Sequence, residues 1–217
     1  KLDDGVVPSV SLRACREAIS GNLCRCTGYR PILQAAKSLA RAPPTALFKT
    51  HQRSPSEPLS DDAADPGGYT SGFREPQSLS ELKTLLRQQP TATLIAGGTD
   101  LMLEVTQKQG RFDRLISLAR VPALQRLELS ADTAIIGSAV TYQDLQAATA
   151  LSWPALHDFL FRLGSPQIRN RGTIGGNLGT ASPIGDLLPI LLAMDATIVV
   201  GHFDEPDRPV AISEFLQ

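Results

Sequence analysis

A proline-rich stretch divides the sequence into two blocks and limits what the chain can fold into. From Ala42 to Gly68, prolines stand at positions 43, 44, 55, 58 and 66 among serines and aspartates. Such a segment has too little apolar surface to form a core, so we expect an exposed linker over residues 43–68. The blocks on either side, residues 1–42 and 69–217, are therefore expected to fold as separate domains.

The overall composition excludes several classes of protein. A net charge of −1 gives no reason to expect a nucleic acid or a membrane surface as partner. The longest apolar run, Leu187 to Met194, contains a proline and is too short to span a bilayer. The first residues do not resemble a signal peptide, and three cysteines make no disulfide framework. We therefore expect a cytoplasmic protein in a reducing setting.

The first block predicts two short helices. Leu12, Cys15 and Ile19 recur at spacings of three and four, which makes one apolar helical stripe. Gly21 and Asn22 tolerate the left-handed conformation that ends a helix. A second helix is expected to begin at Pro31, because proline suits the first helical position.

Cys24 and Cys26 form a C-x-C pair in the segment between these helices. Two neighbouring thiolates can serve one metal ion or cluster, but iron–sulfur clusters and structural zinc each take four ligands. Cys15 is better explained as a small core residue of the stripe. Three histidines lack ligand spacing to the pair: His51, His157 and His202. The chain thus supplies half of a metal site.

The second block alternates helical and strand signals. Ser78 and Glu81 have the spacing of a capping box before an apolar run. Residues 124–129 and 134–137 flank a turn and predict a hairpin. The mixed order predicts an α+β fold rather than a regular βαβ series. The other expected elements are strands at 91–96, 114–118 and 195–201 and helices at 141–149 and 153–163.

Two glycine-rich segments are candidates for binding an anion. Leu94 to Leu101 carries paired glycines after a strand, and Gly172 to Gly179 has four glycines in eight residues. Without a Cβ, backbone N–H groups can approach a phosphate closely. Neither segment has the spacing of a Rossmann or P-loop motif, and each alone is equally well explained as a turn. Together they favour a dinucleotide or flavin.

Three motifs resemble the molybdenum hydroxylases, the xanthine dehydrogenase and aldehyde oxidase group. GNLCRCTGYRPIL resembles the end of their 2Fe–2S domain, and LIAGGTDLML and RNRGTIGGNLGTASPIGDLLP resemble their FAD domain. The resemblance implies a helical fragment of a 2Fe–2S domain followed by a two-subdomain FAD-binding domain of the PCMH type, with its C-terminal part missing. The layout is most similar to the small subunit of a bacterial xanthine dehydrogenase.

The resemblance also assigns cofactor residues. Cys24 and Cys26 match two cluster ligands, and the upstream C-x-x-C that completes the cluster either precedes Lys1 or has been lost. Pro166 departs from the basic or polar residue expected there. The positions that match FAD-binding positions are Leu94, Ile95, Ala96, Gly97, Gly98, Thr99, Asp100, Leu101, Leu163, Thr173, Ile174, Gly175, Gly176, Asn177 and Asp186.

The implied function is electron transfer. A molybdopterin-binding large subunit would hydroxylate a purine, and electrons would pass through 2Fe–2S centres to FAD and NAD+ in a heterotetramer. No histidine falls in a flavin loop, so we expect non-covalent FAD, and no residue is assigned as catalytic. Two alternatives stay open. One is the flavoprotein of an aldehyde oxidase or carbon monoxide dehydrogenase; the other is a truncated, non-catalytic module that binds zinc or copper or serves in docking.

Four arginines lie near these motifs: Arg25, Arg30, Arg169 and Arg171. They could neutralise a cluster or meet FAD phosphates, but we favour solvated or partner-facing charge, since exposed ion pairs contribute only ~0–1 kcal/mol. Three aromatic residues are expected to pack a helix rather than stack on flavin: Trp153, Phe159 and Phe161.

Overall fold

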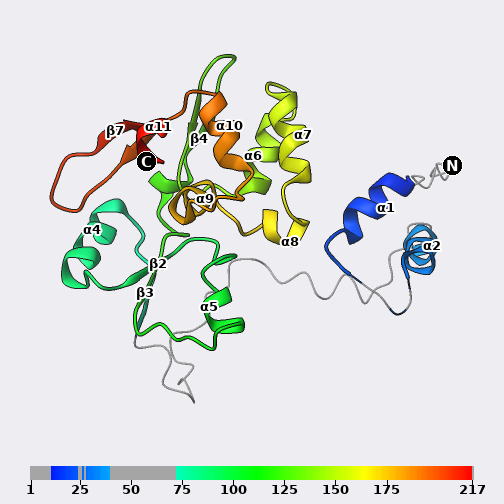
Figure 1. The fold of residues 1–217 in the computed structure, drawn as a ribbon, viewed down its shortest axis with the longest axis horizontal. Coiled ribbons are helices and arrows are strands. Elements are labelled where there is room, and N and C mark those ends of the chain that lie inside the picture. The colour runs from blue at the N-terminus through cyan, green and yellow to red at the C-terminus, as the bar shows by residue number, and fades with distance from the viewer. Residues whose placement is uncertain (1–10, 24–25, 27, 40–71, 217) are drawn as a thin grey trace, which may run out of the picture. The chain divides into compact units, whose positions relative to one another are not determined.

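The computed structural model describes residues 11–23, 26, 28–39 and 72–216 (Figure 1). It separates into two compact units, residues 1–66 and 67–217. The predictions for Cys24, Arg25 and the linker lie outside the described residues. None of the helices in the described ranges is long and apolar enough to cross a membrane.

In the first unit, the structure describes two helices. Helix α1 spans Leu12–Ile19, and its N-cap Ser11 accepts a hydrogen bond from the Ala14 N–H at 3.1 Å. Cys15 is 3% exposed on this helix, which confirms it as a core residue. Helix α2 spans Tyr29–Leu39 and so begins two residues before the predicted Pro31.

The second unit starts with a small parallel sheet. Its strand order is β1-β3-β2, and Leu94 of β2 pairs with Ile116 of β3. Ile116 is fully buried and packs with Leu82 and Val121. Helices connect the parallel strands in this part, a local βαβ arrangement within the second unit. The elements are β1 (Phe73–Arg74), α4 (Leu79–Gln88), β2 (Thr93–Ile95), α5 (Leu103–Thr106) and β3 (Leu115–Ser117).

Antiparallel hairpins and helices make up the rest of this unit, so the α+β class is confirmed. The hairpin β4–β5 pairs Leu127 with Ile136, close to the predicted strands. The elements are η2 (Pro122–Gln125), β4 (Leu127–Leu129), β5 (Ala134–Ile136), α6 (Tyr142–Thr149), α7 (Pro154–Arg162), α8 (Pro166–Arg169), α9 (Ile174–Thr180), α10 (Leu187–Ala193), β6 (Thr197–Val200), β7 (Arg208–Ala211) and α11 (Ile212–Phe215).

The larger core lies among α6, α7, α9 and α10, and Leu145, Leu160 and Leu187 are its most buried members. Trp153 and Phe159 pack against this core, as predicted, and the Trp153 Nε1–H donates to the Ser130 carbonyl at 2.9 Å. In Figure 1, the parallel sheet with α4 and α5 forms one lobe and α6, α7 and α10 form the other. Helix α9 lies between the two lobes in this view.

Two local features differ from the sequence-based expectations. Pro166 was an unexplained departure, but it occupies the first turn of α8, where its fixed φ and missing N–H are tolerated. The second glycine-rich segment is not a loop: Thr173 is the N-cap of α9, and residues 174–180 are helical. The tertiary contacts of this segment override the low helix propensity of its glycines.

Candidate functional site

A cleft of about 690 Å³ brings the two glycine-rich segments together. All of residues 94–101 line it, and so do Thr173, Gly175, Gly176 and Asn177 from the start of α9. In Figure 1, α9 lies between the two lobes, and β2, which the first segment follows, belongs to the lobe with the parallel sheet. The fold therefore places most of the predicted FAD residues in one cavity, and its size is within the range of ligand sites.

The loop after β2 provides unused backbone donors. Gly98 has φ +75°, a conformation that favours glycine, and its carbonyl accepts from the Met102 N–H at 3.0 Å. Within the described part of the chain, no hydrogen bond uses the N–H groups of residues 97–101. A row of free N–H groups at a turn can bind an anion, and the Thr99 hydroxyl is a further donor beside it.

The first turn of α9, in contrast, is already saturated. The N–H groups of Ile174 and Gly175 donate to the carbonyls of Val140 (3.0 Å) and Ser138 (2.8 Å), and the Gly176 N–H donates to Thr173 Oγ1 at 3.0 Å. We expected both segments to cradle an anion in the same way. Within the described part of the chain, the loop at residues 97–101 has a run of free donors, whereas the N–H groups in the first turn of α9 bind to other protein groups.

The glycines on the two sides of the cleft serve different purposes. A Cβ on Gly97 would overlap the carbonyl oxygen of Arg171, and one on Gly175 would overlap Ser138. These two glycines allow backbone segments to touch. A Cβ on Gly179 would meet nothing within 4 Å, although Gly179 lines the cleft. This surface is therefore open to a ligand.

Asn177 and Tyr142 add a polar wall to the cleft. The side-chain oxygen of Asn177 is buried and has no hydrogen-bond partner among the described residues. Tyr142 is 6% exposed. Burial raises the pKa of its hydroxyl, and a hydrogen bond with Asn177 opposes this effect. Because an unpaired buried acceptor is costly, the Asn177 oxygen suits a ligand that brings a hydroxyl or N–H donor.

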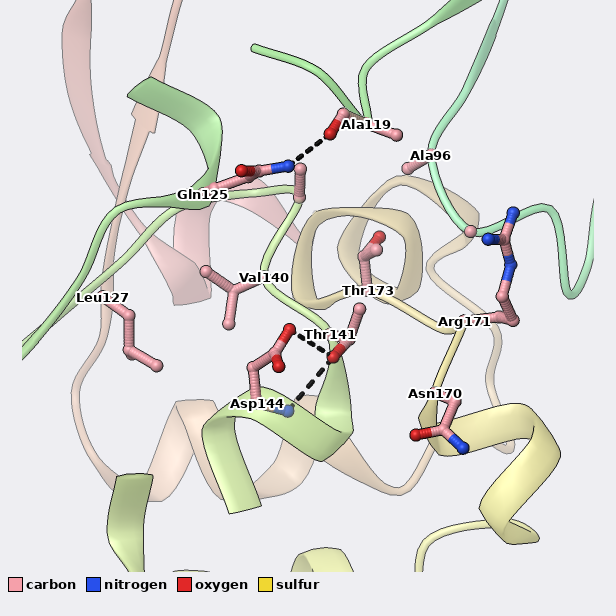
Figure 2. A pocket seen from close by; sticks show the side chains of 12 residues that line it. Ala96, Ala119, Gln125, Leu127, Val140, Thr141, Asp144, Asn170, Arg171 and Thr173 are labelled. Atoms are coloured by element: carbon pink, nitrogen blue, oxygen red, sulfur yellow. Dashed lines mark hydrogen bonds between the residues drawn. The ribbon is translucent and has the colours of Figure 1, made fainter. Parts of the chain in front are cut away.

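A second hollow of about 320 Å³ adjoins the cleft (Figure 2). It shares Ala96, Gly97 and Thr173 with the cleft. Figure 2 shows its polar groups: Asp144 accepts from the Thr141 hydroxyl at 2.6 Å, and the Gln125 amide donates to the Ala119 carbonyl. The two hollows therefore share Gly97, the first residue of the loop with the free donors.

Some predicted residues lie elsewhere. Leu163 packs against the larger core and does not line the cleft. Ile174 is 4% exposed in that same core. Asp186 is exposed at the start of α10 and follows Gly185, which does line the cleft. Tyr142 was not predicted as a site residue, because the sequence indicates only that it lies on a helix at residues 141–149.

Arg169 differs from both interpretations considered for it. It is 6% exposed, and its Nη1 donates to the carbonyls of Phe161 and Gly164, each at 2.9 Å. It is therefore buried rather than solvated, and its Nε has no hydrogen-bond partner among the described residues. Arg171 is exposed and lines the smaller hollow. Phe161 packs on the Arg169 guanidinium, with 5.4 Å between that group and the ring centroid.

This chain supplies fewer cysteine ligands than the predicted metal site needs. Cys26 is exposed, and no group of three potential ligands occurs among the described residues. With Cys24, the chain offers two thiolates where a 2Fe–2S cluster takes four ligands. The cysteines of this chain alone do not complete a cluster.

Comparison with known proteins gives two family matches. Residues 69–217 match the model of the FAD binding domain in molybdopterin dehydrogenase, and residues 7–37 match that of a [2Fe-2S] binding domain.

Similar proteins carry related names. The chain is 28% identical to a xanthine dehydrogenase of Drosophila pseudoobscura pseudoobscura over 88% of this chain and 18% of that protein. It is 36% identical to the nicotinate dehydrogenase FAD-subunit of Eubacterium barkeri over 59% of this chain and 45% of that subunit. A carbon monoxide dehydrogenase structure from Hydrogenophaga pseudoflava superposes with a TM-score of 0.62 at 28% identity, covering 67% of this chain and 52% of that one. The chain thus spans only part of each relative.

Proposed function

The chain belongs to the family of FAD binding domains in molybdopterin dehydrogenases and also carries a [2Fe-2S] binding domain, and from this premise we propose that it is the electron-transfer part of a xanthine dehydrogenase-like oxidoreductase. In this proposal a molybdopterin-binding large subunit hydroxylates a purine, and NAD+ is the final acceptor. Similarity to named xanthine dehydrogenases over most of this chain supports it. Bound FAD would supply the redox chemistry, while the protein binds and orients it.

The observation that carries the proposal is the row of N–H groups at residues 97–101, which make no hydrogen bond within the described part of the chain and belong to a loop that lines one cleft with the start of α9. A diphosphate needs several donors and a close approach, and this loop offers both. We assign the diphosphate to residues 97–101 and a ligand hydroxyl to the unpaired oxygen of Asn177. The Gly179 side of the cleft leaves room for the ligand.

The two adjoining hollows also suit a dinucleotide. Their shared wall at Ala96, Gly97 and Thr173 lies beside the free donors, so a diphosphate held there would have space on either side. A mononucleotide would need only one of the two hollows. We therefore propose that the two halves of FAD extend from the shared wall in different directions.

The iron–sulfur part of the proposal is limited to what this chain contains. Cys24 and Cys26 would supply two thiolates, and a complete cluster requires two further ligands. We derive no step through the cluster from these residues. We propose domain bounds of 1–42, 43–68 and 69–217, with a heterotetramer as the assembly and the cytoplasm as the location.

A second candidate is the flavoprotein component of another molybdenum hydroxylase. The 36% identity to a nicotinate dehydrogenase FAD-subunit and the fold shared with a carbon monoxide dehydrogenase favour it. The FAD site would be the same in both candidates, but the substrate of the partner would differ. Assays of the assembled oxidoreductase with xanthine, nicotinate and carbon monoxide separate the candidates, and turnover of xanthine alone supports the first.

The first experiment is the visible spectrum of the purified chain, with FAD added and any released cofactor identified by chromatography. We expect about one FAD per chain. Gly179→Leu should weaken FAD binding at least about tenfold, because the new side chain occupies the cleft at a position without close neighbours.

The control is Gly179→Ala, which adds one methyl group and should bind far better than the leucine variant. Far-UV circular dichroism checks that both variants stay folded. A colourless wild-type chain that does not take up added FAD would overturn the proposed function. Metal analysis tests the remaining alternative, since stoichiometric zinc without acid-labile sulfide would favour a metal-binding module.

A further inference from the structure

Arg169 is a buried cation without a counter-ion. Its side chain is 6% exposed, and the ion pairs of the described residues do not include it. Burial lowers the pKa of its guanidinium. Burying a charge is costly unless hydrogen bonds compensate it. Within the described residues, Nη1 of Arg169 makes two hydrogen bonds and Nε is buried without a partner.

These contacts join three pieces of chain. Nη1 of Arg169, at the end of α8, donates to the carbonyl of Phe161 in the last turn of α7 and to the carbonyl of Gly164 in the connecting turn, both at 2.9 Å. The ring of Phe161 adds a cation–π contact. Gly164 has φ +62°, so the turn has a conformation that an ordinary side chain rarely adopts. Arg169 thus closes the α7–α8 turn.

The residues after Arg169 connect the α7–α8 turn to the cleft. The carbonyl of Ile168 accepts from the N–H groups of Arg171 (3.1 Å) and Gly172 (2.6 Å), which makes a tight turn. The Arg171 carbonyl then touches Gly97 so closely that no Cβ would fit there. The Gly172 carbonyl accepts from the Tyr142 N–H at 3.0 Å. A continuous chain of hydrogen bonds and close contacts therefore runs from Arg169 to the first free donor of the loop.

We propose that Arg169 is a positioning residue for the FAD diphosphate loop at residues 97–101. It does not touch the ligand; it fixes the turn that sets where the Arg171 carbonyl meets Gly97, and so the direction of the free N–H groups. This inference rests on the proposed function. It gives a binding role to an arginine whose Nη1 donates to protein carbonyls.

The test compares Arg169→Met and Arg169→Lys with Arg162→Met. Methionine keeps the unbranched apolar stem but removes both hydrogen bonds of Nη1, whereas lysine keeps the charge and can still donate a hydrogen bond. Arg162 is an exposed arginine at the end of α7, so its replacement removes the same charge from the same segment. The dissociation constant of FAD is measured by flavin fluorescence, at a temperature where far-UV circular dichroism shows the variant folded.

We expect Arg169→Met to raise the dissociation constant of FAD about tenfold, which corresponds to the loss of about one buried hydrogen bond. Arg169→Lys should restore part of the affinity. The visible circular dichroism of the bound flavin should change in Arg169→Met. Arg162→Met should stay within about twofold of wild type. A purely structural role would lower the melting temperature and leave both the dissociation constant and the flavin signal of the folded protein unchanged.

An unchanged dissociation constant and flavin signal in folded Arg169→Met would overturn the inference, and so would equal effects of Arg162→Met and Arg169→Met. If Arg169→Met does not fold, the lysine variant decides: wild-type affinity and an unchanged flavin signal contradict the role of Arg169. A wild-type chain without affinity for FAD would instead overturn the proposed function. The two failures are therefore distinguishable.

Discussion

At the scale of single residues, the glycines of the cleft are not equivalent, although the sequence presents them as two similar clusters. Gly97 and Gly175 are required because another backbone or side chain occupies the place of a Cβ. Gly179 has open space instead and lies within helix α9. The same substitution should therefore have opposite effects on stability at these positions.

We predict that Gly97→Ala lowers the free energy of unfolding by at least about 2 kcal/mol, because the methyl group forces the Arg171 carbonyl away. Gly179→Ala should raise it by up to about 1 kcal/mol, since alanine favours a helix more than glycine does. Urea unfolding of the two variants measures both effects. Equal losses of stability would contradict the contacts described for Gly97.

At the scale of elements, two helix caps of similar geometry have different surroundings. Ser78 Oγ accepts from the Glu81 N–H at 3.1 Å at the start of α4, and Thr173 Oγ1 accepts from the Gly176 N–H at 3.0 Å at the start of α9. Only the second cap lines the cleft. Stability and ligand binding should therefore separate when the caps are removed.

We predict that Ser78→Ala and Thr173→Ala each lower the free energy of unfolding by about 1 kcal/mol, the usual effect of losing an N-cap. Only Thr173→Ala should also weaken FAD binding, because α9 forms a wall of the cleft. Thermal unfolding and FAD titration of both variants measure the two quantities. A comparable loss of affinity in Ser78→Ala would mean that general stability, rather than the wall, controls binding.

The same elements show what can be predicted from sequence. The Ser78 cap and the helix with Cys15 depend on neighbours three or four positions away, so local spacing is enough to predict them. The parallel pairing of Phe73 with Leu115 and the contact of Gly97 with Arg171 join distant segments, and no local pattern encodes them. Arg169 binds Phe161 and Gly164 across the turn between α7 and α8, and the sequence does not indicate how this turn folds back, so its charge is expected from sequence to face solvent.

The saturated start of α9 also lay beyond sequence reasoning. Its N–H groups are occupied by Val140 and Ser138, which precede it by more than thirty positions. Both glycine-rich segments line one cleft, and glycines allow close approaches whatever causes them. The motifs alone do not distinguish a glycine that contacts the protein itself from one that borders open space. The contacts and hydrogen bonds of the structure make this distinction.

At the scale of the second unit, ion pairs link the parallel-sheet lobe to the β6–β7 hairpin. Arg87 on α4 lies 2.7 Å from Asp204, and its guanidinium also donates to the Phe203 carbonyl. Lys83 on the same helix lies 3.4 Å from Asp207. Both pairs are partly exposed to solvent, so each should contribute only ~0–1 kcal/mol and should weaken as salt screens the charges.

We predict that Arg87→Ala lowers the free energy of unfolding of the chain by about 1 kcal/mol at low ionic strength, and that the loss falls to about half in 1 M sodium chloride. The backbone hydrogen bond to Phe203 accounts for the part that salt does not remove. Arg111→Ala is the control, since Arg111 is exposed and has no ion pair among the described residues. A double-mutant cycle of Arg87 with Asp204 isolates the pair energy. Equal effects of the Arg87 and Arg111 variants at both salt concentrations would show that these ion pairs do not hold the hairpin to α4.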